Sequence, residues 1–310
     1  MFDLYSIGEM VIDFIPGNEP GSFVRNAGGA PANVAIAAAK NGLNVGMCCS
    51  VGDDDFGRFL LKTLKENGVA VVNPELCREA ITTMAFVSLS ETGERSFTFA
   101  RKPGADMFLS EDRVSEADIL DSAIVNAGSC SLSASPEDLA TEKAMRLAHE
   151  AGKLVSFDIN YRDVMWNGDK NKCAEKIREV FPYVDILKIS EEEKDLLCTE
   201  GTVFEQMKRY GIRVVIETLG AAGVRSYFEG KTEEIPGRKA KVVDTTGAGD
   251  AFWGGFLSNL RMQGIVSAQE ITAEKIRTAV NYGNISGWIC VQSKGAIASL
   301  PTKEQIAEYL

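Results

Sequence analysis

The chain alternates short apolar runs with segments of helical periodicity along most of its length. The apolar runs are four to seven residues long, which is typical of strands buried on both faces of a sheet. Strands that alternate with helices in this way are joined as parallel neighbours by helical crossovers. We therefore predict an α/β fold with helices on both faces of a mainly parallel sheet. The strands are expected at 3–8, 44–52, 122–128, 153–159, 184–190 and 212–220, and the helices at 30–42, 55–68, 135–152, 171–181 and 191–197.

Two segments, residues 10–25 and 80–101, depart from this alternation. Both show period-two patterning, with turn signals at Pro16-Gly17 and at Glu91-Thr92-Gly93-Glu94. Neither segment has a helix to cover it, so we expect a small projecting sheet, formed by about 10–25 and 80–103, that covers a cleft. An edge extension of the main sheet is the alternative.

The last part of the chain shows two helical patterns, at 251–264 and 272–290, in place of another strand-helix-strand unit. No internal repeat, low-complexity segment or long linker divides the sequence. We therefore expect a single domain over residues 1–310 that carries the small sheet as a lid.

Charge and cysteine content narrow the class of protein. The net charge of −11 disfavours a nucleic-acid binder, because such proteins concentrate Lys and Arg to neutralise phosphates. The N-terminal stretch does not resemble a signal peptide, and no apolar run approaches the ~18 residues that span a bilayer. Seven cysteines without a CxxC pair fit a reducing compartment. We predict a cytoplasmic protein that binds neither nucleic acid nor membranes.

Histidine supplies the most useful exclusion. The only histidine, His149, lies near the end of a helical pattern, where an imidazole meets the negative end of the helix dipole. This position disfavours a Ser-His-Asp triad and a His-rich metal site. A general base must then be an Asp, Glu, Lys, Tyr or Cys side chain.

Two polar features near the N-terminus are candidates for ligand binding. The pair Gly28-Gly29 permits close backbone approach, and Asn33 can direct an amide at a ligand near a helix N-terminus. A plain helix start with close packing is the alternative. Asp13 lies in an otherwise apolar strand, where a carboxylate must be solvated, paired or hydrogen-bonded to a ligand. Simple alternation onto the wet face of a hairpin competes with the ligand-binding interpretation.

Three polar clusters follow predicted strands, and ligands of open parallel sheets bind beyond the carboxyl ends of the strands. Residues 158–162 form a D-x-N-x-R cluster, in which Arg162 either binds an anionic group or forms a loop salt bridge. Residues 190–193 fit a helix cap, so a magnesium role for Glu193 needs other evidence. The glycines of 218–223 can let a nucleotide lie against the backbone. Neither a P-loop nor a dinucleotide-binding fingerprint is present.

The segment from Asp244 to Asp250 carries the clearest chemical pattern. A Gly-Ala-Gly turn that opens a helix directs backbone N–H groups outward, and it forms an anion hole with the positive end of that helix. Asp250, held beside this hole, could take a proton from a substrate hydroxyl while the amides stabilise a phosphoryl group in transfer. A helix cap is the simpler explanation for the same acid.

Two motifs in this order, GGAPANVA at 28–35 and DTTGAGDAFWGGF at 244–256, resemble the paired signatures of the PfkB (ribokinase-like) carbohydrate kinases. FDINYR, LKISEEE and TLGAAG fall where that family has counterparts, so the resemblance covers essentially the whole chain. It implies a ribokinase-like three-layer α/β/α core, a small β-sheet lid and ATP-dependent phosphorylation of a sugar hydroxyl.

The resemblance also implies roles for individual residues. Asp250 corresponds to the general base, and the anion hole to the amides of Gly247, Ala248 and Gly249. The sugar site corresponds to Asp13, Gly28, Gly29, Asn33, Arg101, Arg162 and Asp250. The ATP site corresponds to Ser190, Thr218, Gly220, Gly223, Gly247, Gly249, Asn281 and Asn284. The cation sites correspond to Glu193, which would hold Mg²⁺ through water, and to Asp244, Thr246, Gly295 and Ser299, which would hold K⁺.

Within the family, the stretches GEMVIDFIP, RKPGAD and KISEEE most resemble fructokinases, which implies that fructose accepts the phosphate. Arg162 keeps 2-keto-3-deoxygluconate as an alternative acceptor, and ribokinase and a non-catalytic sugar or nucleotide sensor are further alternatives. The N-x-x-E element of the family begins here with Ser190, which offers no amide, so the magnesium role rests more heavily on Glu193. Lid sheets of this family can pair two copies, which implies a homodimer.

Overall fold

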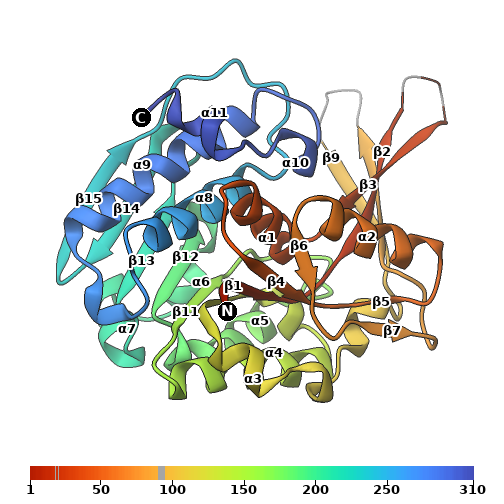
Figure 1. Cartoon of the computed structure of the whole chain (residues 1–310), viewed down its shortest axis with the longest axis horizontal. Coiled ribbons are helices and arrows are strands. Elements are labelled where there is room, and N and C mark those ends of the chain that lie inside the picture. Colours follow the sequence, from red (N-terminus) through yellow and green to blue (C-terminus); the bar gives the residue numbers. More distant parts are fainter. Residues whose placement is uncertain (18, 20, 90–94) are drawn as a thin grey trace.

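The structure is a computed structural model of the whole chain, and it describes every residue except 18, 20 and 90–94. Within the described residues, a nine-stranded sheet runs through the centre of the molecule in the order β15-β14-β13-β12-β11-β10-β1-β4-β6 (Figure 1). Its strands are β1 (Phe2–Ile7), β4 (Val45–Cys48), β6 (Val69–Val71), β10 (Ser122–Gly128), β11 (Leu154–Asp158), β12 (Ile186–Ser190), β13 (Val214–Thr218), β14 (Gly223–Phe228) and β15 (Lys231–Pro236).

Helices cover both faces of this sheet and enclose two hydrophobic cores. Successive side chains of a strand point to opposite faces, so Leu4 and Leu154 join the core beneath α1, α2, α8 and α9, whereas Tyr5 and Val155 join the core beneath α3, α4, α5 and α7. The helices are α1 (Ala30–Lys40), α2 (Asp55–Glu66), α3 (Glu116–Leu120), α4 (Glu137–Glu150), α5 (Lys170–Val180), α6 (Lys194–Leu197), α7 (Val203–Tyr210), α8 (Ala248–Met262), α9 (Ala273–Cys290), α10 (Ala296–Ser299) and α11 (Lys303–Ala307). Short 3₁₀ helices include η1 (Ala105–Phe108), η3 (Ser129–Leu132) and η5 (Glu191–Glu193).

The predicted α/β fold is confirmed. All neighbours from β6 to β13 are parallel, and only the β13–β14 and β14–β15 pairs of the main sheet are antiparallel. The strand predicted at 44–52 divides at Cys49 into β4 and β5 (Ser50–Gly52), and β5 pairs with β7 (Glu75–Cys77) outside the main sheet. Both halves are buried, so the apolar pattern could not reveal the break. The helix predicted at 191–197 is the 3₁₀ turn η5 followed by the one-turn α6.

The two period-two segments form a sheet of their own, which confirms the prediction of a small sheet over that of an edge extension. We call this the small sheet, and within the described residues it has four strands in the order β3-β2-β8-β9. The turn predicted at 91–94 lies outside the described residues. Figure 1 shows these strands projecting to one side of the helical layers. The strands are β2 (Val11–Pro16), β3 (Phe23–Gly28), β8 (Met84–Leu89) and β9 (Arg95–Ala100).

One face of the small sheet packs on α2 through aromatic side chains. Phe14 of β2 stacks on Phe86 of β8 with ring centroids 5.0 Å apart, and Phe56 of α2 meets Phe14 edge-on at 5.7 Å. Because neighbouring strand residues face opposite ways, Asp13 points away from this aromatic face. The small sheet therefore turns Asp13 toward the main body of the molecule.

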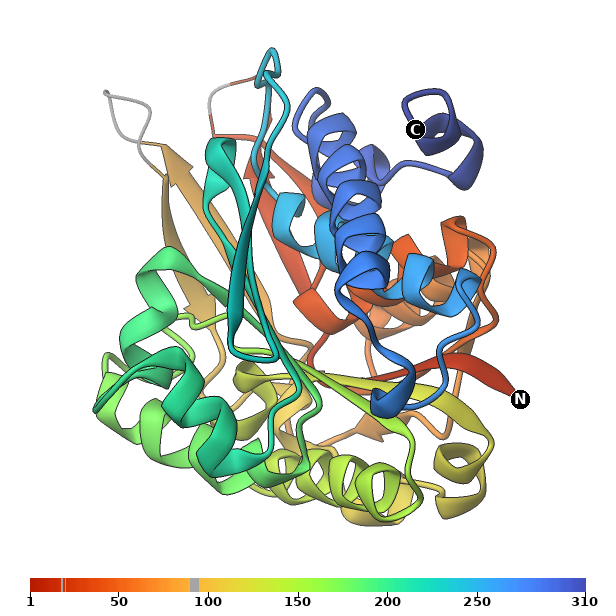
Figure 2. The ribbon, with the colours of Figure 1, turned by 90° about the vertical axis from the view of Figure 1, so that its left-hand side faces the viewer.

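The two helices predicted near the C-terminus are confirmed as α8 and α9, and α8 packs against both α1 and α9. Figure 2 shows the β14–β15 hairpin running alongside α9. The N-terminal end of α1 is tied to β1 by the Ser6 hydroxyl, which donates to the Pro31 carbonyl at 2.9 Å. This packing brings the first turns of α1 and α8 to the carboxyl ends of the parallel strands.

Candidate active site

The glycine turn before α8 has the backbone geometry of an anion-binding helix start. Gly247 precedes the helix with a φ of 78°, in the left-handed region that favours glycine. The Ala251 N–H is the first to donate within the helix, to the Gly247 carbonyl at 2.8 Å. The amides of Gly249 and Asp250 therefore lie at the positive end of α8, before its internal hydrogen bonds begin. The Ala248 N–H, which was predicted to belong to the anion hole, donates instead to the Thr245 carbonyl at 3.2 Å.

The first turns of α1 and α8 are joined by a side-chain hydrogen bond. Asn33 Nδ2 donates to Asp250 Oδ2 at 2.8 Å, although 217 residues separate them in the chain. Both side chains are almost fully buried. The bond fixes the orientation of the Asp250 carboxylate, which a helix-capping role alone would not require.

A cavity of about 430 Å³ lies in front of this pair, between the two helix starts, the strand ends and the small sheet. It brings together eight residues that the sequence predicted as site residues. They are Asp13, Gly29, Asn33, Arg162, Thr246, Gly247, Gly249 and Asp250.

Asp13 extends from β2 into the cavity. A Cβ on Gly28, which pairs with Val11 on the neighbouring strand, would collide with the Asp13 carboxylate, so a larger residue there would displace that carboxylate from its position. The pKa of Asp13 is raised to about 6: burial and, to a lesser extent, the negative charge of Asp250 raise it, and the Arg162 guanidinium lowers it. A buried carboxylate in this position can accept hydrogen bonds from ligand groups in the cavity.

Lys188 is a cavity residue that the sequence analysis did not select. Its Nζ donates to Asp158 Oδ2 at 2.7 Å, and both side chains are buried. Burial alone would lower the pKa of Lys188, but the charges of Asp158 and Glu193 outweigh it and raise that pKa. A Cβ placed on Gly249 would lie 3.6 Å from Nζ. Lys188 therefore puts a permanent positive charge beside the anion-binding turn.

The charges around Asp250 act in opposite directions on its pKa. Burial raises the pKa, and the hydrogen bond from Asn33 and the positive charges of Lys188 and Arg162 lower it, with a net rise. A buried carboxylate with a raised pKa is a stronger base than an exposed aspartate. This is the environment that general-base catalysis requires.

Glu9 and several other cavity residues were also missed. Glu9 lies two residues after the end of β1, where its Oε1 accepts the Ala30 N–H at 3.3 Å, and its pKa is raised to about 7, mainly by burial. A charged residue next to a buried strand end was the signal that could have found Glu9, whereas Lys188 lies within β12. The remaining missed residues are Val11, Ala30, Phe99, Cys130, Asn160, Val164, Met165 and Thr245.

Glu193 holds two strand ends together. Its Oε1 accepts the Tyr161 N–H at 2.6 Å, and its Oε2 accepts the Ser190 N–H at 2.8 Å. The carboxylate is buried and its orientation is fixed, but it does not line the cavity. The described residues contain no group of three His, Cys, Asp or Glu side chains placed to hold a metal ion.

The four residues predicted to hold a monovalent cation lie together. Asp244 Oδ1 accepts both the N–H and the hydroxyl of Thr246, at 2.9 and 2.7 Å. Asp244 Oδ2 accepts the Gly295 N–H at 3.1 Å, and the Ser299 hydroxyl donates to the Gly295 carbonyl at 2.6 Å. This set of oxygen atoms fits a hard cation in its chemistry. It also joins the glycine turn to the α9–α10 segment.

Two residues predicted for the ATP site, Gly247 and Gly249, line the cavity, and the other six lie outside it, near the ends of β12 and β13, the start of β14 and on α9. Thr218 ends β13, and its hydroxyl donates to the Ile189 carbonyl at 3.3 Å. Gly223 has a φ of 106°, and a Cβ there would collide with the backbone of Ile235, so chain packing accounts for this glycine. Asn281 and Asn284 lie on α9, where Asn284 donates to the Pro236 carbonyl at 3.4 Å. Gly220, at the start of a 3₁₀ turn, is exposed.

The two predicted sugar-site arginines are placed differently. Arg162 lines the cavity, and its Nη1 donates to the Tyr161 carbonyl at 2.9 Å. Arg101 is not among the cavity residues. Its guanidinium is buried in a set of five residues that we call the Arg101 cluster, which consists of Thr83, Arg101, Asp106, Ser133 and Glu137.

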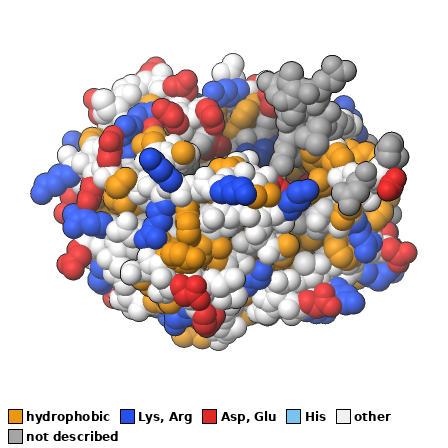
Figure 3. Space-filling view, turned by 90° about the horizontal axis from the view of Figure 1, so that it is seen from above, with side chains coloured by type: hydrophobic (Ala, Val, Ile, Leu, Met, Phe, Trp, Pro, Cys, Tyr) orange, Lys and Arg blue, Asp and Glu red, His pale blue; other side chains and the backbone are white. Residues whose placement is uncertain are grey.

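Other sequence expectations concern the periphery. His149 lies in the last turn of α4, as predicted, with its ring 5.9 Å from that of Tyr183. No helix among the described residues has the length and apolar character to cross a membrane. Figure 3 shows acidic and basic side chains interspersed on the face seen from above. That mixture differs from the continuous basic stripe that tracks a nucleic-acid backbone.

Comparison with known proteins places these observations in a family. The family model described as pfkB family carbohydrate kinase matches residues 1–303. Fructokinase-1 of Oryza sativa subsp. japonica is 38% identical over 315 residues, which cover 98% of this chain and 96% of the relative.

Solved structures of fructokinases also match this chain over nearly its whole length. A fructokinase with bound ATP from Xylella fastidiosa matches with a TM-score of 0.90 and 31% identity over 99% of this chain and 98% of that one. Fructokinase from Vibrio cholerae O395, with fructose, ADP and a calcium ion, matches with a TM-score of 0.86 and 31% identity over 99% and 98%. A double mutant of the Vibrio cholerae enzyme, with fructose, ADP and a potassium ion, matches with a TM-score of 0.87 and 30% identity over 99% and 97%. Because the family model covers nearly the whole chain and the paired motifs meet at one cavity, this protein belongs to the pfkB family of carbohydrate kinases.

Proposed function

We propose that this pfkB-family protein is an ATP-dependent fructokinase that converts D-fructose to fructose 6-phosphate. The observation that carries the proposal is the cavity in which a buried carboxylate, an anion-binding helix start and a buried lysine meet. The fructokinase relatives, at 30–38% identity with near-complete coverage, support fructose over ribose and 2-keto-3-deoxygluconate. A non-catalytic sensor could dispense with Asp250, whereas this chain keeps it as a buried carboxylate with a raised pKa.

In the proposed mechanism, Asp250 accepts the proton of the sugar hydroxyl as the hydroxyl oxygen attacks the γ-phosphorus of ATP. The bond from that phosphorus to the β,γ-bridging oxygen breaks, and ADP leaves. Asn33 holds the Asp250 carboxylate at 2.8 Å, so little reorganisation is required at the moment of transfer. The amides of Gly249 and Asp250 and the Lys188 ammonium stabilise the negative charge of the transferring group.

We propose that the sugar lies between Asp250 and the small sheet. Asp13 accepts hydrogen bonds from sugar hydroxyls, and Gly28 and Gly29 would contact the sugar through their backbone. Arg162, at the cavity wall, contributes a positive charge that lowers the pKa values of Asp13 and Asp250. The small sheet acts as a lid of a single kinase domain, because Asp13 and Phe99 on two of its strands line the cavity.

We propose that ATP extends from the glycine turn toward the ends of β13 and β14. Its adenosine part would then contact Thr218, Gly220, Gly223, Asn281 and Asn284. Mg²⁺ would supply charge neutralisation for the transferring phosphate, and Glu193, which ends the S-x-x-E element that begins at Ser190, would hold it through water. K⁺ would bind at the loop of Asp244, Thr246, Gly295 and Ser299, next to the turn that binds phosphate.

We also propose a cytoplasmic homodimer that forms through the small sheet. Phe23 and Val24 on β3 are 47% and 55% exposed, which is high for large apolar side chains. Sedimentation of the parent chain and of a Phe23→Ser, Val24→Ser variant tests this proposal. The parent should sediment as a dimer and the variant as a monomer.

The acceptor screen is the experiment that tests the function. ADP release is measured with MgATP and fructose, ribose, 2-keto-3-deoxygluconate or no sugar, with and without potassium. We expect the highest kcat/KM for fructose, at least about tenfold above the other sugars, which corresponds to ~1.4 kcal/mol. A higher kcat/KM for another sugar would overturn the assignment of fructose, and sugar-independent ADP release would overturn the kinase assignment.

A further inference from the structure

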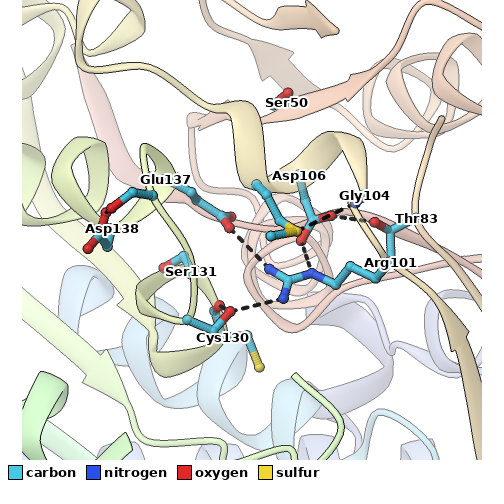
Figure 4. Close-up of polar contacts among 12 residues, drawn as sticks. Ser50, Thr83, Arg101, Gly104, Asp106, Cys130, Ser131, Glu137 and Asp138 are labelled. Atoms are coloured by element: carbon cyan, nitrogen blue, oxygen red, sulfur yellow. Dashed lines mark hydrogen bonds and ion pairs between the residues drawn. The ribbon is translucent and has the colours of Figure 1, made fainter. Parts of the chain in front are cut away.

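The Arg101 cluster lies at the base of the β8–β9 hairpin, where the chain enters β8 and leaves β9 (Figure 4). We call these two points the roots of the hairpin. Met84 pairs with Ala100 at the end of the hairpin, so Thr83 and Arg101 are the residues immediately beyond the last pair. Asp106 joins these two roots with one carboxylate. Its Oδ1 accepts the Thr83 hydroxyl in a short hydrogen bond, and its Oδ2 accepts Arg101 Nε at 2.6 Å.

The guanidinium then ties this joint to the helical layer. Arg101 Nη1 donates to the Ser133 hydroxyl at 3.0 Å, and Nη2 contacts Glu137 Oε2 at 3.5 Å, at the start of α4. Each of the three guanidinium nitrogens therefore has an acceptor from the protein. The planar fork of an arginine can make such contacts simultaneously, and a lysine ammonium cannot reproduce that geometry.

The cluster is close to the row of the small sheet that faces the cavity. Phe99 pairs with Ala85, and Ala85 pairs in turn with Asp13 of β2. Ala85 and Phe99 are each two residues from Thr83 and Arg101, respectively. The two end members of this row, Asp13 and Phe99, line the cavity. The Ile12 N–H also donates to the Thr83 carbonyl at 2.9 Å, so β2 is attached to the same root. A shift of the root would carry Asp13 and Phe99 with it.

We infer that the Arg101 cluster anchors the small sheet over the cavity, and that Arg101 is a positioning residue which does not contact the sugar. This inference rests on the proposed function for its kinetic consequences. Its physical basis is that Arg101 and Asp106 are 7% and 0% exposed, and that buried charges which are mutually hydrogen-bonded resist displacement. The anchor fixes the position of Asp13 relative to Asp250. That relative position determines whether the sugar hydroxyl is oriented for attack on the phosphoryl group.

Two pairs of variants test the anchor. Arg101→Lys removes the fork and keeps the charge, with Arg113→Lys as its matched control, because Arg113 makes a similar two-nitrogen contact with Glu75 away from the small sheet. Thr83→Val removes the hydroxyl that Asp106 accepts, and Thr83→Ser retains it. The measurements are KM for fructose, KM for ATP, kcat, and hydrogen exchange of the peptides that cover β8 and β9.

We expect Arg101→Lys to raise KM for fructose about tenfold and Thr83→Val about threefold, with KM for ATP within about twofold of the parent. Exchange in β8 and β9 should accelerate in both, whereas Thr83→Ser and Arg113→Lys should match the parent. A parental KM and parental exchange in Thr83→Val would overturn the anchor, even if Arg101→Lys fails to fold. A raised KM in Arg101→Lys with unchanged exchange would instead assign Arg101 to direct sugar contact. If the parent does not phosphorylate fructose, the proposed function fails, and the exchange data alone decide the anchor.

Discussion

The cavity in front of Asp250 and the Arg101 cluster are both groups of buried charges, and they differ in what the charges face. In the Arg101 cluster, the guanidinium is surrounded by Asp106, Ser133 and Glu137, and all three neighbours belong to the protein. At the cavity, Asp250 and Lys188 each have one protein partner and also border an open space of about 430 Å³. Charges whose neighbours are all from the protein hold elements together, and charges that border a cavity can act on a ligand.

The same difference separates two roles of acidic residues in a first helical turn. Asp55 begins α2 on the surface and pairs with Arg58, which accounts for it as a helix-terminal charge. Asp250 occupies the first turn of α8, but it is buried, hydrogen-bonded to another helix and exposed to the cavity. The comparison therefore gives a matched pair for testing whether Asp250 is more than a cap.

The largest expected effect is that of Asp250→Asn. We expect kcat with fructose to fall by ~10²–10⁴-fold, because the amide cannot accept the hydroxyl proton. The matched control Asp55→Asn also removes a first-turn carboxylate and should leave kcat at the parental level. Steady-state kinetics on both variants check this, and an Asp250→Asn variant within about tenfold of the parent would remove Asp250 from the role of base.

The next effect in size is expected from Asp13→Asn. A hydrogen bond to a charged group is worth ~1.5–3 kcal/mol, so KM for fructose should rise by about tenfold to a hundredfold. KM for ATP should stay near the parental value, since the predicted ATP residues lie at β13 and β14. Hydrogen exchange in the small sheet should also be parental, which distinguishes this variant from Thr83→Val. Equal rises in both KM values would argue against a sugar-side role for Asp13.

A pH profile gives a smaller but directional effect. Asp250 must be ionised to accept a proton. We therefore expect kcat/KM for fructose to be highest above the pKa of Asp250 and to fall as the pH decreases through that pKa. Burial raises the pKa values of Asp250 and Asp13, the latter to about 6, and the charge of Arg162 lowers both. Arg162→Gln should therefore move the acid limb to higher pH. An acid limb that stays in place or moves to lower pH would contradict this charge arrangement.

The smallest effect is expected from Glu137→Gln. Burial and the nearby Asp106 raise the pKa of Glu137 well above its ordinary value, which favours the neutral form of this side chain. Glutamine keeps an acceptor for Arg101, so KM for fructose should stay within about threefold of the parent. Asp106→Asn removes the charge that pairs with Arg101 and should change KM more. A larger effect for Glu137→Gln than for Asp106→Asn would reverse our assignment of the charges in the cluster.

The sequence was sufficient for the fold class and for the residues that motifs carry. Asp250 and Asn33 lie in short, specific signatures, and the strand-helix alternation placed both signatures at strand ends, where the structure brings them into contact. The separate small sheet was also predictable, because period-two patterning without a covering helix distinguished it from the core.

The sequence was insufficient where the outcome depends on the direction of one side chain. The resemblance to fructokinases implied that Arg101 lies at the sugar, whereas the structure turns its guanidinium toward Asp106 and Glu137. Lys188 was missed because a lysine in an apolar strand can extend its ammonium to solvent, and only the structure shows it paired with Asp158 beside Gly249. Both outcomes depend on contacts between residues that are distant in the chain.

The most direct test of the central claim is the identity of the phosphorylated product. The purified chain is incubated with fructose and MgATP, and fructose 6-phosphate and ADP are quantified in the same samples over time. We predict that the two products form in equimolar amounts, and that neither accumulates when Asp250→Asn replaces the parent. ADP without fructose 6-phosphate, or phosphate on a different hydroxyl of the sugar, would contradict the account.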